Sequence, residues 1–160
     1  MKLRIDLTRQ ELELLDDDGA VLHRYPVSTA ANGPGEECGS QRTPRGRHIV
    51  RAKIGADHPP GTVFKGRRPT GEIYTPELGE REPDRDWILS RILWLSGKEP
   101  GFNRLGNRDT MRRYIYIHGT PDETFEQAPR SHGCVRMRNA DLVELFDLVP
   151  PYTPVDIIDT

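Results

Sequence analysis

A cysteine and two histidines are the residues of this chain whose types and spacing best suit covalent chemistry. His132 precedes Cys134 by two positions, and His118 lies sixteen positions before the cysteine. The thiolate is the reactive form of cysteine, so a catalytic thiol requires a base or a positive partner nearby. Either imidazole could accept the thiol proton and return it to a leaving amine. The spacing therefore predicts a cysteine nucleophile paired with a histidine base.

Glycines follow or precede both reactive positions. Gly133 allows the backbone to turn sharply beside the nucleophile. We expect this turn to leave the backbone N–H groups of Gly133 and Cys134 free to bind an oxyanion. Gly119 gives His118 space and a permissive neighbour.

The same three side chains also suit a metal ion. His118, His132 and Cys134 are ligands that zinc accepts, although no acidic ligand or second paired motif is obvious. A zinc-binding module without catalytic activity is therefore the alternative to a thiol enzyme, and stoichiometric zinc in the purified protein would favour it. Cys38 lies in a predicted loop beside two glutamates, which disfavour a thiolate, and is interpreted as an incidental free thiol.

The elements that carry these residues follow from hydrophobic periodicity. Residues 112–118 alternate aromatic and β-branched side chains and predict a strand that ends at His118. After the cysteine, Asn139 suits a helix N-cap, and two prolines at 150–151 end the helix. Between them, apolar residues recur at helical spacing, namely Leu142, Leu145, Phe146 and Val149.

The remaining periodic segments are short and predict strands. They cover residues 3–7, 11–15, 20–28, 48–54 and 154–158, with a hairpin turn at 16–19. Residues 87–95 fit a helix or a strand, and we favour a strand. The sum is a mainly β protein with one or few short helices, arranged as a sandwich or barrel.

Residues 55–86 have little periodicity. They hold five Gly and five Pro, and only Glu72–Tyr74 suggests a short ordered piece. A stretch this long is either disordered or a functional covering loop. A substrate-covering role and a solvent-exposed elaboration both remain open.

Composition limits the classes of function. The chain has 160 residues and a formal charge of −2, so we predict a single domain over 1–160 and no nucleic-acid partner. No apolar run exceeds four residues, which argues against a membrane span. Two cysteines exclude a disulfide framework. No apolar leader precedes the first predicted strand, so a cytoplasmic location is expected.

The motif residues also resemble those of a known family. Residues 118–120, His-Gly-Thr, followed by residues 131–136, Ser-His-Gly-Cys-Val-Arg, resemble the signature of L,D-transpeptidases with a YkuD-type catalytic domain. Residues 25–29, the Thr-Pro-Arg-Gly turn at 43–46 and the helix after the nucleophile are similar as well. The resemblance extends over residues 2–158 and implies a YkuD-like β-sandwich of mixed sheets.

The resemblance implies a role for each motif residue. Cys134 would attack the carbonyl of the third residue of a peptidoglycan stem tetrapeptide, an L-centre of a diamino acid joined to a terminal D-Ala. His118, oriented by the backbone at Gly119, would be the general base and acid. His132 and Gly133 would form, with the cysteine, the oxyanion hole and the walls of the site.

Further expectations concern binding and partners. Ser131 and Arg136 would bind substrate, with Arg136 either anchoring the turn or meeting a carboxylate. The resemblance implies stem peptides or muropeptides as partners, inactivation by carbapenem-type β-lactams, and no metal or organic cofactor. Because a cytoplasmic enzyme would meet soluble muropeptides, water is the expected acyl acceptor, as in an L,D-carboxypeptidase of wall recycling. Transfer to an amine of another stem peptide or of a D-amino acid is the alternative.

Overall fold

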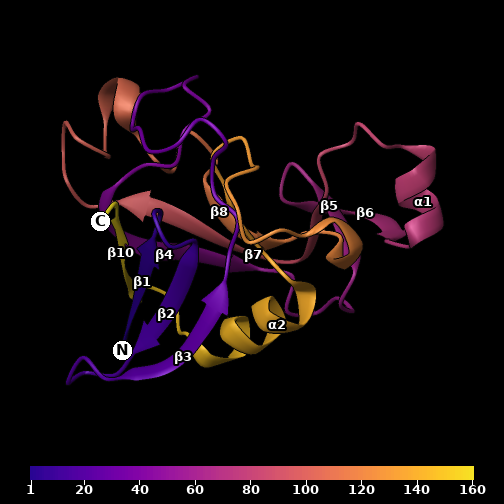
Figure 1. Cartoon of the computed structure of the whole chain (residues 1–160), viewed down its shortest axis with the longest axis horizontal. Helices are drawn as coiled ribbons and strands as arrows, with labels where there is room; N and C mark the ends of the chain where they lie inside the picture. The colour runs from indigo at the N-terminus through magenta and orange to yellow at the C-terminus, as the bar shows by residue number, and fades with distance from the viewer.

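The computed structural model describes residues 1–160, and the chain is mainly β with two α-helices (Figure 1). The helices are α1 (Pro76–Arg81) and α2 (Asn139–Leu148), and short 3₁₀ turns cover Gly106–Arg108 and Asp122–Thr124. The strands are β1 (Lys2–Asp6), β2 (Glu11–Leu15), β3 (Val21–Pro26), β4 (Gly46–Ile54), β5 (Thr62–Lys65), β6 (Arg68–Ile73), β7 (Ile88–Gly97), β8 (Tyr116–Gly119), β9 (Val135–Met137) and β10 (Pro154–Ile158).

All ten strands belong to one mixed sheet. Its main path runs β3-β2-β1-β10-β4-β7-β5-β6, and β8 and β9 branch from β7. β1 pairs parallel with β10, and β8 pairs parallel with β9, whereas the other pairs are antiparallel. The predicted fold class, mainly β with mixed pairing and few helices, is confirmed, and the strands are hydrogen-bonded into one continuous sheet.

β7 is the strand to which the remaining elements of the site attach. Along one edge it pairs with β4 and then with β5, and along the other edge it pairs with β8. Leu89, Ile92 and Leu93 of this strand are fully buried. The prediction of a strand rather than a helix over residues 87–95 is therefore confirmed, and burial on both faces explains why its pattern was ambiguous.

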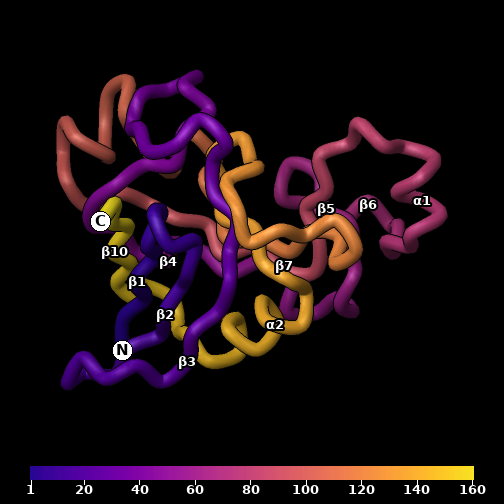
Figure 2. Tube along the Cα trace, in the orientation of Figure 1, coloured from indigo at the N-terminus to yellow at the C-terminus, as the bar shows by residue number.

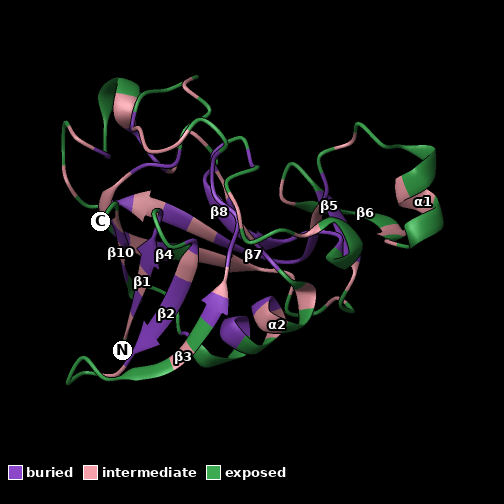
Figure 3. Cartoon of the chain, in the orientation of Figure 1, coloured by how far each residue is buried: buried purple, intermediate pink, exposed green.

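The main hydrophobic core lies between the sheet and α2. The helix contributes Leu142, Leu145 and Phe146 to a cluster of 20 buried residues, as its helical spacing predicted. Figure 3 shows purple, buried surfaces on β1, β2 and one side of α2, and mostly green, exposed ones on α1. The Lys53 ammonium donates to the carbonyls of Phe146 and Val149 at 2.5 and 2.7 Å, which compensates the C-terminal end of the helix.

Two predicted boundaries were wrong. β8 begins at Tyr116 rather than at residue 112, because the preceding residues form turns and Tyr114 has a φ of 58°. The N-cap of α2 is Arg138 rather than Asn139. The Asn139 side chain instead donates to the Thr120 carbonyl at 2.9 Å and accepts from a serine hydroxyl of β7 at 2.6 Å, so it ties the helix to the sheet.

Residues 55–86 are ordered, so the prediction of possible disorder was wrong. They form β5, β6 and α1, which project together from the rest of the molecule, on the far side from both termini (Figure 1). We call residues 62–81 the lobe. Tyr74 and Leu78 of the lobe pack against a small cluster of Val63, Trp87 and Leu89. No helix of the protein combines the length and the apolar character needed to cross a membrane.

Candidate active site

Buried hydroxyl groups hold the turn of residues 131–134 in shape. Ser131 Oγ donates to the Cys134 carbonyl at 2.6 Å and accepts from the N–H of Gly133 at 3.2 Å. Thr43 Oγ1 donates to the Gly133 carbonyl at 2.9 Å, and both hydroxyl residues are buried. Gly133 itself has a φ of 131°, a conformation that favours glycine over any side chain.

The segment after β3 supports this turn from one side. Isolated bridges pair Ser28 with Arg136 and Ala30 with Ser131. Figure 2 shows the two segments, purple after β3 and orange before α2, running beside each other. The turn is therefore held by main-chain pairing as well as by side-chain hydroxyls.

The predicted oxyanion hole differs at one of its two donors. The N–H of Gly133 is occupied by Ser131 Oγ, whereas the N–H of Cys134 has no acceptor within the protein. The expectation of two free N–H groups was therefore wrong for Gly133, because a serine two residues earlier supplies a local acceptor. The Ser131 hydroxyl shapes the turn from within, and both of its hydrogen bonds are used there rather than for the substrate contact that was expected.

His118 reaches the site from the strand beside the turn. The parallel pairing of β8 with β9 places His118 opposite Arg136, two residues after Cys134. Its Nδ1 lies 2.7 Å from the Gly119 carbonyl oxygen, which can only accept a hydrogen bond. Nδ1 therefore carries the ring proton, and Nε2 is left as a base. A Cβ atom at Gly119 would collide with the Asn139 side chain, so this position requires glycine.

The thiol rests in its neutral form. Cys134 Sγ accepts the N–H of Tyr116 at 3.3 Å and lies 3.4 Å from the Tyr114 carbonyl oxygen. Desolvation raises the pKa of the Cys134 thiol to about 11 and lowers the pKa of the His118 imidazole below its usual value. Thiol and imidazole therefore both favour their uncharged forms, so the thiol has to lose its proton when the sulfur attacks.

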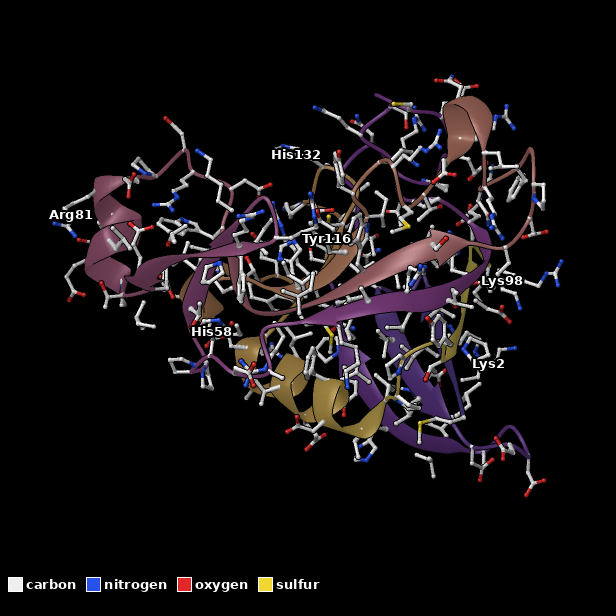
Figure 4. All side chains as sticks on the ribbon, turned by 180° about the vertical axis from the view of Figure 1, so that it is seen from behind. Lys2, His58, Arg81, Lys98, Tyr116 and His132 are labelled. Atoms are coloured by element: carbon white, nitrogen blue, oxygen red, sulfur yellow. The ribbon has the colours of Figure 1, made fainter.

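Thiol and imidazole open into one cavity of about 440 Å³, which we call the thiol cavity. Its walls include three arginines and a single carboxylate, namely Arg67, Arg113, Arg136 and Asp86. The exposed His132 and the buried Ser131 also line it. Figure 4 shows His132 above Tyr116 in the rear view, and both residues line this cavity.

An ion pair separates the thiol cavity from a second one. Arg136 Nη2 lies 3.1 Å from Asp86 Oδ1. These two residues and His132 also line a neighbouring cavity of about 540 Å³, so the two cavities adjoin at these three residues, which we call the wall. The neighbouring cavity, which we call the acidic cavity, carries three further carboxylates and one further arginine, namely Glu80, Asp84, Glu123 and Arg85.

The predicted site residues are thus brought together, with different tasks for some of them. Cys134, His118 and His132 face the thiol cavity. Arg136 meets a carboxylate of the chain itself, Asp86, so its guanidinium forms part of the wall. Gly119 and the turn glycine act through the backbone, as described above.

Three contributors to the site were missed from the sequence. Tyr116 provides the N–H that contacts the thiol, and Asp86 partners Arg136. Arg67 lines the thiol cavity from the lobe. Tyr116 was recognisable, since it precedes His118 by two positions on a predicted strand and must point to the same face. Asp86 and Arg67 belong to residues 55–86, whose periodicity gives no such signal.

The ligand set required by the zinc alternative is not assembled. No group of three or more His, Cys, Asp or Glu side chains is arranged to hold a metal ion. The ring nitrogen of His118 that faces Gly119 is already engaged. One thiol and two imidazoles line the same cavity without being gathered round a common point.

Fold and site together define a class of protein, a mainly β catalytic domain in which a cysteine on a tight turn faces a histidine on the neighbouring strand. The family model described as YkuD, the L,D-transpeptidase catalytic domain, matches residues 2–157. The chain belongs to this family, and the resemblance found in the sequence is confirmed. No protein with a curated description matches it.

Several solved structures share the fold. An L,D-transpeptidase of Xylanimonas cellulosilytica is 22% identical with a TM-score of 0.56, and 98% of this chain covers 59% of that one. An L,D-transpeptidase of Mycobacterium smegmatis is 18% identical with a TM-score of 0.55, covering 98% and 57%. L,D-transpeptidase 3 of Mycobacterium tuberculosis, solved with a faropenem-derived adduct, is 15% identical with a TM-score of 0.58, covering 98% and 59%. The chain thus spans less than two thirds of these proteins.

Proposed function

We propose that this chain transfers the acyl group of peptidoglycan stem tetrapeptides through a thioester on Cys134. The observation that carries the proposal is one cavity that holds this thiol, the His118 imidazole and three arginines. Stem peptides carry several carboxylates, which guanidinium groups bind well. Membership of the L,D-transpeptidase family supports the same chemistry.

The geometry suggests the order of steps. As Sγ of Cys134 attacks the carbonyl carbon of the L-diamino acid residue, Nε2 of His118 takes the thiol proton. The free N–H of Cys134 faces the developing oxyanion. Collapse of the tetrahedral intermediate breaks the C–N bond, and His118 returns the proton to the amine of the departing D-Ala. An acceptor then attacks the thioester while His118 takes its proton, and the thiol is regenerated.

Water is the acceptor that we propose, which makes the enzyme an L,D-carboxypeptidase. The wall formed by Asp86, Arg136 and His132 stands between the thiol cavity and the acidic cavity. A water molecule can reach the thioester without opening this wall. A second peptide bound in the acidic cavity would have to bring its amine past this ion pair.

The acidic cavity supports a second candidate, transfer to an amine. Its three carboxylates besides Asp86 would attract the ammonium group of an acceptor peptide or of a D-amino acid. In this case the ion pair of Asp86 with Arg136 would open during turnover. The two candidates share the thioester and differ only in the second half of the reaction.

A product assay with a purified tetrapeptide muropeptide distinguishes the two. Hydrolysis yields a tripeptide and free D-Ala only, even when an excess of a D-amino acid is present. A dimer, or an exchanged D-amino acid in good yield, would overturn the choice of water. Asp86→Asn, which weakens the wall, should raise the fraction of transfer if the acidic cavity holds the amine.

Inhibitors provide a second test of the thiol. Related structures were solved with imipenem and as an avibactam carbamoyl enzyme. We expect imipenem to acylate Cys134, which intact-protein mass spectrometry would record as one added molecule. Cys134→Ala should give no adduct, whereas an adduct confined to the exposed Cys38 would contradict the assignment of the nucleophile.

A further inference from the structure

Arg67 occupies an unusual place in the turn of the β5–β6 hairpin. It lies between β5 and β6, with a φ of 66°, and it lines the thiol cavity although it is 67 residues away from Cys134 in the sequence. Its backbone conformation is rare for a residue with a side chain. The hairpin therefore presents this guanidinium to the cavity at some conformational cost.

Three aromatic side chains hold the Arg67 guanidinium in place. Its central carbon lies 4.7 Å from the ring centre of Trp94 and 4.8 Å from that of Tyr114. Nη1 donates to the Tyr116 hydroxyl at 2.9 Å. Such stacking fixes the plane of a guanidinium and leaves the N–H groups at its edge free to donate hydrogen bonds.

The remaining N–H groups of Arg67 have no partner. The protein contains no ion pair of this arginine, and its only side-chain hydrogen bond is the one to Tyr116. An arginine presents five donors in a fixed fork, so four are left for a ligand. A carboxylate that accepts two of them would match this fork.

The other two arginines of the thiol cavity have partners within the protein, although Nε of Arg136 is buried without one. Arg136 pairs with Asp86 at 3.1 Å. Arg113 donates to the carbonyls of Gly35 and Arg42 at 3.2 and 2.6 Å. Arg67 is therefore the arginine of this cavity whose guanidinium is stacked between aromatic rings and makes no ion pair and no main-chain hydrogen bond.

We propose that Arg67 binds the free C-terminal carboxylate of the donor peptide, the carboxylate of the residue that leaves. This inference rests on the proposed function and names its specificity determinant. Tyr116 contacts the thiol through its N–H and Arg67 through its hydroxyl, so one residue spans from nucleophile to guanidinium. The terminal carboxylate of the donor lies one residue, about 3.5 Å of extended chain, beyond the scissile carbonyl. The contact of that carbonyl with Sγ and the hydrogen bond of the carboxylate to the guanidinium extend this reach toward the length of the Tyr116 side chain. Anchoring that carboxylate places the scissile carbonyl beside Sγ and limits the leaving group to a single amino acid.

The test compares two donors that differ only at the C-terminus, a tetrapeptide acid and its carboxamide. The wild type should prefer the acid by about 10- to 100-fold in kcat/KM, the range that a charge-assisted hydrogen bond supplies. Arg67→Ala should lower kcat/KM for the acid by that factor, leave the carboxamide unchanged and so bring the ratio close to one. Arg67→Lys, which keeps the charge and loses the fork, should give an intermediate ratio.

Arg68→Ala is the matched control. Arg68 is the exposed neighbour on β6 and makes no side-chain hydrogen bond, so its removal changes the net charge equally and should leave the ratio as in the wild type. If Arg67→Ala lowered kcat/KM equally for the acid and the carboxamide, Arg67 would have only a structural role in the lobe. That result would overturn the proposal.

Measurements of binding affinity test this inference independently of the proposed reaction. The affinity of Cys134→Ala for acid and carboxamide, measured by calorimetry with and without Arg67→Ala, reports recognition without turnover. A preference for the acid that disappears with Arg67, in a protein whose wild type cleaves neither donor, would contradict the reaction and support the site. Cleavage of both donors at equal rates, with equal affinities, would contradict the site and support the reaction.

Discussion

The turn of residues 131–134 and the lobe of residues 62–81 are held in opposite ways. The turn is fixed from inside by the buried hydroxyls of Thr43 and Ser131. The lobe is held by two small apolar clusters, which include the buried Val63 and Phe64, and by partly exposed ion pairs such as Arg85 with Glu72. Buried, fully satisfied hydrogen bonds specify one geometry, whereas exposed ion pairs contribute little.

The way each region is held fits the part that it plays in the site. Bond making requires that Sγ and the imidazole stay in fixed positions. Recognition requires a surface that a peptide can enter, and the lobe supplies Arg67 and part of both cavities. We therefore expect substitutions in the turn to act on chemistry and stability together, and substitutions in the lobe to act on substrate selection.

The largest expected effect is at the nucleophile. Cys134→Ala should abolish thioester formation and turnover, because no other thiol or hydroxyl of the cavity is paired with a free imidazole nitrogen. Cleavage of a tetrapeptide, followed by chromatography, is the measurement. Cys38→Ala should retain full activity, since Cys38 is exposed in a loop outside the cavity. Turnover by Cys134→Ala would contradict the whole mechanism.

The next effect compares two threonines, one in each region. Thr43→Val removes a hydroxyl that donates to the Gly133 carbonyl and accepts the N–H of Ala30. Each buried partner left without a hydrogen bond should cost about 1–3 kcal/mol of unfolding free energy, and kcat should fall as the turn loosens.

Thr70→Val is the control for this comparison. Thr70 is exposed on β6 and bonds only to Glu72, so the unfolding free energy should change by less than about 0.5 kcal/mol. Urea titrations of both variants provide the measurement. Equal losses of stability in the two variants would show that turn and lobe are held alike.

The same contrast explains what could be predicted from the sequence. Most of the strands and α2 bury one face, so their periodicity predicted them, and the motif residues 118–120 and 131–136 predicted the family. In the lobe, β6 and α1 are mostly exposed, and only the short strand β5 is buried. An exposed hairpin has no hydrophobic alternation to read, and Arg67 reaches the thiol only through the tertiary pairing of β5 with β7.

A similar limit applies to the Gly133 amide and to the N-cap of α2. Ser131 Oγ captures the Gly133 N–H, and the Asn139 amide turns toward the Thr120 carbonyl. Both side chains have more than one possible partner nearby, and the tertiary arrangement selects between them. Residue type and spacing alone do not predict which partner each side chain binds.

The acid limb of the pH profile tests the buried chemistry. Desolvation lowers the pKa of His118, so the imidazole stays neutral at a pH where a free imidazole would be protonated. The fall of kcat/KM on acidification should therefore lie below pH 6.5, the ordinary value of a histidine. Asp86 raises the pKa of His118 and Arg136 lowers it, so Asp86→Asn should move the acid limb to still lower pH. A limb that moves upward would contradict this electrostatic arrangement.

The alkaline side reports on the thiol. In a Cys38→Ala background, the rate of alkylation of Cys134 by iodoacetamide should keep rising up to pH values near 11, because desolvation raises the pKa of this thiol to about 11. The rate of a preformed thiolate would instead level off near neutral pH. Such a plateau would show that the sulfur is activated before substrate binds.

The smallest expected effect lies at the base of the lobe. Arg85 stacks on Trp87 with its central carbon 4.4 Å from the ring centre, and its ion pairs with Glu72 and Glu82 are partly exposed. Arg85→Ala should therefore lower the global unfolding free energy by less than about 1 kcal/mol, the usual limit for such contacts. Amide exchange should accelerate in residues 62–81 and remain unchanged in β7 and β8, because β7 is held along both edges. Faster exchange in β8 would mean that the lobe and the nucleophile turn open as one unit. It would contradict the idea that substrate recognition and catalysis rest on separately held parts of the protein.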